Sequence, residues 1–258
     1  MSAAPSVGPL LGLVLVALTA VAALLVRLGR LGSARRVAVA AVRAALQLAA
    51  VSLLITAVLG SAGWTGLFIA GMVLVATVTA GRRVTGSARG RAWWAAVPIV
   101  AGVAPAVALL PATGVIPPRP VAVLPIAGIF VGGAMIATAL TGRRALDELH
   151  TRRGEYEAGL SLGMPPRDAA LEVCRPAGAL ALVPVLDQTR TVGLVTLPGA
   201  FVGVLLGGAD PIEAGATQLL VLIGLLAVEA VAVLITLELV AAGRLRDHRP
   251  DGPPGRVY

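Results

Sequence analysis

Three polar side chains interrupt apolar stretches of the chain and are the first candidates for chemistry. Arg43 and Gln47 lie four residues apart, so a helix places them on one face. Glu229 lies near the middle of the last apolar stretch, where a carboxylate is costly in a membrane and is a functional candidate by default. We expect all three on a substrate pathway. The alternatives are that Arg43 extends to the membrane surface or pairs with Glu229.

A second candidate is the segment that contains Pro198 and Gly199. Proline removes a backbone donor and glycine adds freedom, so we expect a helix to kink or break there. Broken helices in membranes line cavities or protein contacts, because lipid cannot satisfy the freed backbone groups. Gly199, Gly203 and Gly207 are spaced four apart, which also permits close helix packing, for example at a dimer interface. Substrate gating and close packing both stay open.

The residue types that several other functions need are missing. The 258 residues include no lysine, so the chain has no Walker A lysine and cannot itself be a P-loop ATPase. Its single cysteine, Cys174, forms neither an intrachain disulfide nor a cysteine-based zinc site. His150 and His248 both fall in polar segments. We expect no enzyme activity, no bound metal, no cofactor of its own and no nucleic-acid partner.

Membrane helices must position these residues. The chain is 57% hydrophobic and 13% charged, whereas soluble domains carry about 25% charged residues. A membrane helix needs about 20 apolar residues. Six stretches have about that length, and a shorter one at 191–207 adds a seventh. We therefore predict an all-α polytopic protein of the plasma membrane, embedded in the lipid bilayer, with spans at 7–26, 37–59, 62–80, 92–110, 121–141, 191–207 and 217–242.

The arginines predict the orientation of these spans. Nineteen of the 21 lie in alternate loops or in the tail. Since basic loops stay cytoplasmic, the N-terminus is predicted outside and the C-terminus inside. We expect one permease domain over 1–242, with a cytoplasmic loop at 142–190 and a disordered tail at 243–258. Within that loop, 176–186 is either a half-buried helix or the start of the sixth span.

The loop follows a pattern of helix, glycine turn and helix. A compact projection of this kind suits docking into a groove on a partner. Its spacing resembles the EAA loop of ABC-transporter permeases, carried here by Glu157, Ala158, Gly159, Gly163, Val173 and Pro176. In that loop the glycine permits the turn that brings the short helix against the ATPase. Gly159 at the third position departs from the common form, and an ordinary amphipathic surface loop is the alternative.

The stretch from Pro184 to Gln218 resembles the FetB-type iron-export ABC permeases, a family that also contains plant permeases linked to aluminium tolerance. The shared features are Asp187, Arg190, Leu197-Pro198-Gly199, the Gly207-Gly208-x-x-Pro211 turn and Gln218. The resemblance extends over nearly the whole chain. It implies a homodimeric permease subunit of an ABC transporter that exports a metal, such as iron, or a related small solute. A separate cytoplasmic ATPase would hydrolyse the ATP.

One departure bears on the substrate. Family members follow Leu-Pro-Gly with Met-Met-Thr-Gly, whereas this chain has Ala200-Phe-Val-Gly203, without the thioethers or the hydroxyl. Iron is therefore an expectation from the resemblance alone. Two other functions remain: a secondary transporter with Glu229 as ion carrier and no ATPase, or a membrane anchor that transports nothing. The absence of a clear internal repeat disfavours the first, and the polar residues within the spans disfavour the second.

Overall fold

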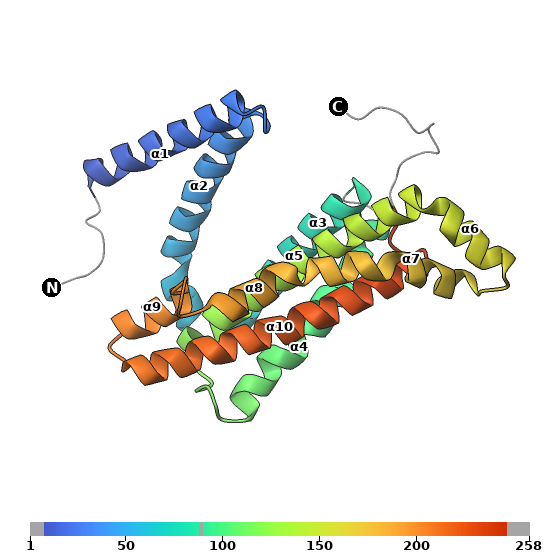
Figure 1. The fold of residues 1–258 in the computed structure, drawn as a ribbon. Helices are drawn as coiled ribbons and strands as arrows, with labels where there is room; N and C mark the ends of the chain where they lie inside the picture. The colour runs from blue at the N-terminus through green and yellow to red at the C-terminus, as the bar shows by residue number, and fades with distance from the viewer. Residues whose placement is uncertain (1–7, 88–89, 247–258) are drawn as a thin grey trace. The chain divides into compact units, whose positions relative to one another are not determined.

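The computed structural model describes residues 8–87 and 90–246 of the chain (Figure 1). These residues form α-helices and one 3₁₀ helix, with one isolated bridge between Val192 and Thr196 and no named strand among them. The helices are α1 Pro9–Leu28, α2 Ala34–Leu59, α3 Ala62–Thr85, η1 Gly90–Ala95, α4 Ala96–Ala112, α5 Pro120–Thr151, α6 Arg153–Ser161, α7 Pro166–Ala181, α8 Val183–Thr191, α9 Gly199–Leu206 and α10 Pro211–Ala241.

Within residues 8–87 and 90–246, seven helical stretches are long and apolar enough to cross a membrane. The predicted all-α polytopic fold with seven spans is thereby confirmed, while the orientation of the termini stays a prediction. The seven stretches are Pro9–Leu28, Ala34–Leu59, Ala62–Thr85, Gly90–Ala112, Pro120–Thr151, Pro166–Thr191 and Pro211–Ala241.

The chain divides into two compact units, Met1–Ser61 and Ala62–Tyr258. The described part of the first unit is the pair α1 and α2, which pack against each other. Gly29 ends α1, and Arg30 takes a left-handed conformation with φ 52° in the connection. The predicted polar pair Arg43 and Gln47 lie on one exposed face of α2, as their four-residue spacing predicts.

The second unit is built around α5 and α10, which contact each other more than any other two helices. Glycines permit the close approach of α10 to α5 and to α4. A Cβ on Gly224 would lie 2.5 Å from the Cζ of Phe130, a fully buried ring. A Cβ on Gly102 of α4 would lie 2.8 Å from the carbonyl oxygen of Val228. Because Gly224 and Gly102 have no side chain, the helix backbones can approach closely, as they do at small residues in many membrane helix pairs.

The second unit has two ends, which we name by the short helices there (Figure 1). The α6 end also holds the C-terminal ends of α5 and α10, where Arg167 binds Glu238 through two hydrogen bonds of 2.9 and 2.7 Å. The Arg244 guanidinium lies 4.6 Å from the centre of the Trp94 ring at the same end. The α9 end holds the N-terminal ends of α5 and α10 and the C-terminal end of α8.

The predicted sixth span at 191–207 is wrong. That stretch contains only α9, whose eight residues extend about 12 Å, against a hydrocarbon core of about 30 Å. The sixth candidate span is instead Pro166–Thr191, formed by α7 and α8. Small buried residues of α7, among them Ala177 and Gly178, let this helix pack against α5 and α10. A Cβ on Gly178 would come within 2.7 Å of the Leu237 side chain.

The structure also differs from the predicted loop at 142–190. Helix α5 continues to Thr151, with Gly142 packed against Val84 and Ala145 fully buried. Most of 142–190 therefore belongs to α5, α7 and α8. Only α6 and its flanking turns, between the end of α5 at Thr151 and the start of α7 at Pro166, remain as a connection. Of the predicted tail, residues 243–246 are described, and Leu245 is fully buried there. Residues 247–258 lie outside the described residues, so the predicted disorder stays untested.

Candidate functional site

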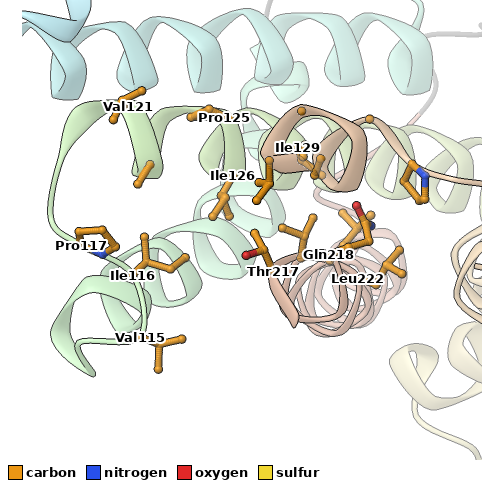
Figure 2. Close-up of a pocket in the computed structure, with 18 of the residues that line it drawn as sticks. Val115, Ile116, Pro117, Val121, Pro125, Ile126, Ile129, Thr217, Gln218 and Leu222 are labelled. Atoms are coloured by element: carbon orange, nitrogen blue, oxygen red, sulfur yellow. The ribbon is translucent and has the colours of Figure 1, made fainter. Parts of the chain in front are cut away.

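A cavity of about 900 Å³ lies at the α9 end of the second unit (Figure 2). Its walls come from the α4–α5 connection, the first turns of α5, the end of α8, and the facing sides of α9 and α10. Binding sites for small molecules typically enclose about 300–1,000 Å³. Most of the lining is aliphatic, and its polar side chains are Gln188, Thr217 and Gln218. The cavity has the size and composition of a site for an organic molecule.

The predicted helix break forms one wall of this cavity. Helix α8 ends at Thr191, and the chain then turns through Gly193, whose φ is +80°. Pro198 precedes the first residue of α9, Gly199, so the interruption of the helices extends over residues 192–198 and ends at the predicted position. The predicted kink within a continuous span at 191–207 does not occur, because α8 has already ended at Thr191. Pro198, Gly199 and Gly203 all line the cavity. A Cβ on Gly199 or Gly203 would meet nothing within 4 Å, so these glycines border open space and not a packed helix in the described residues.

Gln218 of α10 holds α9 in place. Its side chain is 4% exposed, and its Oε1 accepts a hydrogen bond of 3.1 Å from the backbone N–H of Phe201. The first N–H groups of any helix lack partners within that helix, so this glutamine satisfies one of them. Asp210 caps α10 in turn, accepting hydrogen bonds from Ile212 N–H at 2.7 Å and Glu213 N–H at 3.0 Å. The short turn between the two helices and this side-chain bond together position the cavity wall.

Glu229 lies one helical turn beyond the cavity. It follows Gln218 and Leu225 on the same face of α10, and Leu225 lines the cavity. The Glu229 side chain is 8% exposed, and its Oε1 lies 2.7 Å from where a Cβ on Gly133 would stand. It makes no hydrogen bond or ion pair with any other residue that the structure describes. The alternative, an ion pair between Glu229 and Arg43, would involve residues of two different units and stays a prediction.

The predicted coupling residues divide into two groups. Glu157, Ala158, Gly159 and Gly163 lie in α6 and the turn that follows it, while Val173 and Pro176 lie within α7 in the bundle. The pattern therefore continues from a projecting hairpin into a packed helix, with Val173 buried and Pro176 exposed. The sequence analysis left 176–186 open between a half-buried helix and the start of the sixth span, and the structure places Pro176 inside α7, which belongs to the sixth candidate span.

The α6 hairpin depends on one glycine and on ion pairs. Gly163 has φ +85°, a left-handed conformation that suits glycine, and the turn separates α6 from α7 as predicted. Arg152 binds Glu155, and this hydrogen bond lowers the pKa of the Glu155 carboxyl below its ordinary value. Glu157 pairs with Arg153 at 2.8 Å. The outer face of the hairpin is polar and exposed, which leaves it available to a partner.

Two ion pairs lie on the exposed face of α7 and α8. Glu172 pairs with Arg175 at 3.0 Å, and Asp187 pairs with Arg190 at 3.6 Å. The loop prediction placed Arg190 with the cytoplasmic arginines, but the structure places it at the α9 end, because α7 and α8 run the length of the bundle.

Comparison with known proteins assigns the family. Residues 10–243 match the family described as "Uncharacterised protein family (UPF0014)". This chain belongs to that family. The match extends over both units, so family membership applies to nearly the whole chain and not to one motif. No solved structure matches the chain.

Three relatives of this family member carry informative names. The rice protein "UPF0014 membrane protein STAR2" is 38% identical over 226 residues, which are 86% of this chain and 79% of the relative. "Protein ALUMINUM SENSITIVE 3" of Arabidopsis thaliana is 40% identical, over 63% of this chain and 59% of its own length. "Probable iron export permease protein FetB" of Escherichia coli is 34% identical, over 54% of this chain and 53% of its own length. The predicted resemblance is confirmed, and the chain is a multi-pass membrane protein.

Proposed function

We propose that this chain is the permease subunit of an ABC transporter in the plasma membrane, driven by a separate cytoplasmic ATPase. The observation that carries the proposal is the α6 hairpin, a short polar helix that projects from one end of an apolar bundle and turns at Gly163. Helices in a groove are a common mode of protein recognition, and α6 has the length for it. Closure of the ATPase on ATP would move the hairpin as a rigid body and, through α7, move the bundle.

The α7–α8 face supports a homodimer as the working unit. Its pairs Glu172–Arg175 and Asp187–Arg190 are exposed on a stretch long enough to cross the bilayer. Charged side chains in membrane helices face a protein partner or a water-filled path, since contact with lipid is costly. We propose that this face meets a second copy or the path between two copies. Cofactors are bound by the ATPase and not by this chain.

The proposed cargo is a metal or a related small solute, moved outward. The name of the E. coli relative supports iron export for that protein, and the break at Pro198, next to a cavity, supports a path near α9. Gln218 would set the width of this path through its bond to α9. Arg43 and Gln47 stay predicted pathway residues of the first unit.

The experiment that tests the proposal is co-purification with an ABC ATPase encoded beside this chain. Gly163→Arg adds bulk and strain at the hairpin turn, and we expect it to abolish co-purification seen with the wild type. Gly114→Arg is the matched control, because Gly114 also has a positive φ of +73° and open space around it but lies in the α4–α5 connection. We expect Gly114→Arg to retain the ATPase.

Failure of the folded wild type to bind any ATPase would contradict the proposal. Secondary transport would then be the better function, since a buried Glu229 without a partner among the described residues is the residue such a mechanism needs. Equal loss in both arginine variants would show a folding defect and would remove the support from the hairpin.

A further inference from the structure

We infer that the cavity beside α9 binds a cation with an apolar body, either a lipophilic organic cation or a metal enclosed in an organic chelate, with Glu229 as its counter-charge. That this ligand is the cargo rests on the proposed function, but its binding does not. The inference concerns the chemical form of the ligand, which neither the family nor the names of the relatives state.

The lining of the cavity disfavours a bare metal ion. Ca²⁺ and Mg²⁺ take six or more oxygen ligands, and transition metals favour imidazole or thiolate. The lining contains no histidine, cysteine or carboxylate, and its polar side chains are two amides and one hydroxyl. No group of three metal-ligating side chains occurs anywhere in the described part of the chain. A bare ion that entered would lose its water without gaining an equivalent set of ligands.

The same lining favours an apolar body. Ile126 and Ile129 of α5 and Leu222 of α10 line the space (Figure 2), and Leu225, farther along α10, lines it as well. Burial of apolar surface is favourable in proportion to the area removed from water. With about 900 Å³, the cavity is large enough for a molecule of several rings. Gln188 and Thr217 supply the few polar contacts that would orient such a molecule.

Glu229 gives the cavity a preference for a positively charged ligand. It lies four residues after Leu225, which is about 6 Å along the helix axis. On α5, Gly133 has no side chain to separate the carboxylate from Leu225; a Cβ there would touch both residues. Arg119 and Arg190, the basic side chains at the α9 end, are exposed, and Arg190 is paired with Asp187. A cation in the cavity would provide the partner that the Glu229 carboxylate lacks among the described residues, in surroundings where charges are poorly screened.

The test is binding of radiolabelled tetraphenylphosphonium to the purified full chain in lipid nanodiscs, without ATPase. Tetraphenylborate is the matched probe, because it has nearly the same shape and the opposite charge. We expect saturable binding of the cation, no saturable binding of radiolabelled borate measured in a separate sample, and no competition with the cation by Fe²⁺ alone. Displacement by the tris(phenanthroline)iron(II) cation would identify a chelated metal as one form of ligand, whereas its absence would restrict the ligand to organic cations.

Two variants separate the contributions of charge and shape. Glu229→Gln should weaken cation binding about tenfold or more, as loss of a close charge partner does. Glu213→Gln, an exposed carboxylate on the same helix, should leave it unchanged. Gly203→Phe fills the cavity and should abolish binding of the cation, which keeps the inference testable if Glu229→Gln fails to fold.

Three results would overturn the inference. They are equal binding of the cation and the borate, displacement of the cation by Fe²⁺ alone, and wild-type binding by either Glu229→Gln or Gly203→Phe. Because no ATPase is present, these outcomes are independent of the co-purification experiment. The cavity inference and the proposed function can therefore fail separately.

Discussion

Gly224 shows how much of the bundle depends on single missing side chains. It faces the fully buried ring of Phe130, the largest fully buried side chain in the described residues. The ring is 0% exposed and belongs to the buried core of the second unit, so little space is left for it to move. Sequence inspection places Gly224 in an apolar helix but does not reveal what it faces.

We predict that Gly224→Ala destabilises the protein, by about 1–3 kcal/mol, as overpacking of a core usually does. A new Cβ would lie 2.5 Å from the Cζ of Phe130, closer than two carbons can approach. Gly215→Ala on the same helix is the control, since its Cβ would meet nothing within 4 Å. Thermal unfolding in detergent should give a lower Tm for Gly224→Ala alone. A Tm equal to that of Gly215→Ala would contradict the packing described for Phe130.

At the scale of elements, α9 is a helix that depends on contacts with its neighbours, mainly α10, for its position. Eight residues are too few to form a stable isolated helix, so tertiary contacts must hold it. Its contacts with the described helices are mainly with α10, and the bond from Phe201 N–H to Gln218 is the side-chain link between them. Because α9 forms a wall of the cavity, whatever loosens α9 also changes the cavity.

We predict that Gln218→Leu loosens α9 without unfolding the bundle. The substitution keeps the size of the side chain and removes the acceptor for Phe201, at a cost of about 1–3 kcal/mol for the unsatisfied N–H. Hydrogen–deuterium exchange should become faster in 199–206 and stay slow in α5. Thr217→Val is the control, because the Thr217 hydroxyl donates to the Glu213 carbonyl within α10 and does not contact α9 through that bond. Unchanged exchange in Gln218→Leu would show that packing alone holds α9.

At the scale of the whole molecule, the path of α7 and α8 decides which segments share a membrane surface. A sixth span at 166–191 puts Arg190 and α9 at the end opposite to the α6 hairpin. The arginines at the α6 end are more numerous, which agrees with a cytoplasmic location of that end. The α6 hairpin and the cavity would then lie toward opposite surfaces, joined by α7, α8 and α10.

We predict that cysteines at positions 119 and 190 react with a membrane-impermeant maleimide from the same side, and a cysteine at 163 from the other. The variants Arg119→Cys, Arg190→Cys and Gly163→Cys would be made in a Cys174→Ser background, since the native thiol is buried. Labelling of intact cells should modify positions 119 and 190 only. Labelling of position 190 from the same side as 163 would instead restore 142–190 as a single loop.

The sequence by itself determined the features that depend on local chemistry. Six of the seven spans follow from apolar stretches that are long enough to cross, because a bilayer sets a minimum helix length. The start of α9 at Gly199 follows from Pro198, which cannot continue a preceding helix, and the turn at Gly163 follows from the freedom of glycine in left-handed backbone conformations. The pairing of Asp187 with Arg190 follows a helical spacing of three. Each of these depends on residues within a few positions of one another.

Only the tertiary structure decided which stretch forms the sixth span and what surrounds the polar residues. The segment 166–191 is less apolar than its neighbours because one face carries Glu172 and Arg175, while its other face buries Cys174 and Ala177 against α5 and α10. Hydropathy averaged along the sequence combines the charged face with the buried face, so the average for 166–191 is lower than for the other spans. The proximity of Pro198, Gly203 and Gln218 to one cavity, with Glu229 one turn beyond, likewise arises from contacts between distant elements, which no local pattern encodes.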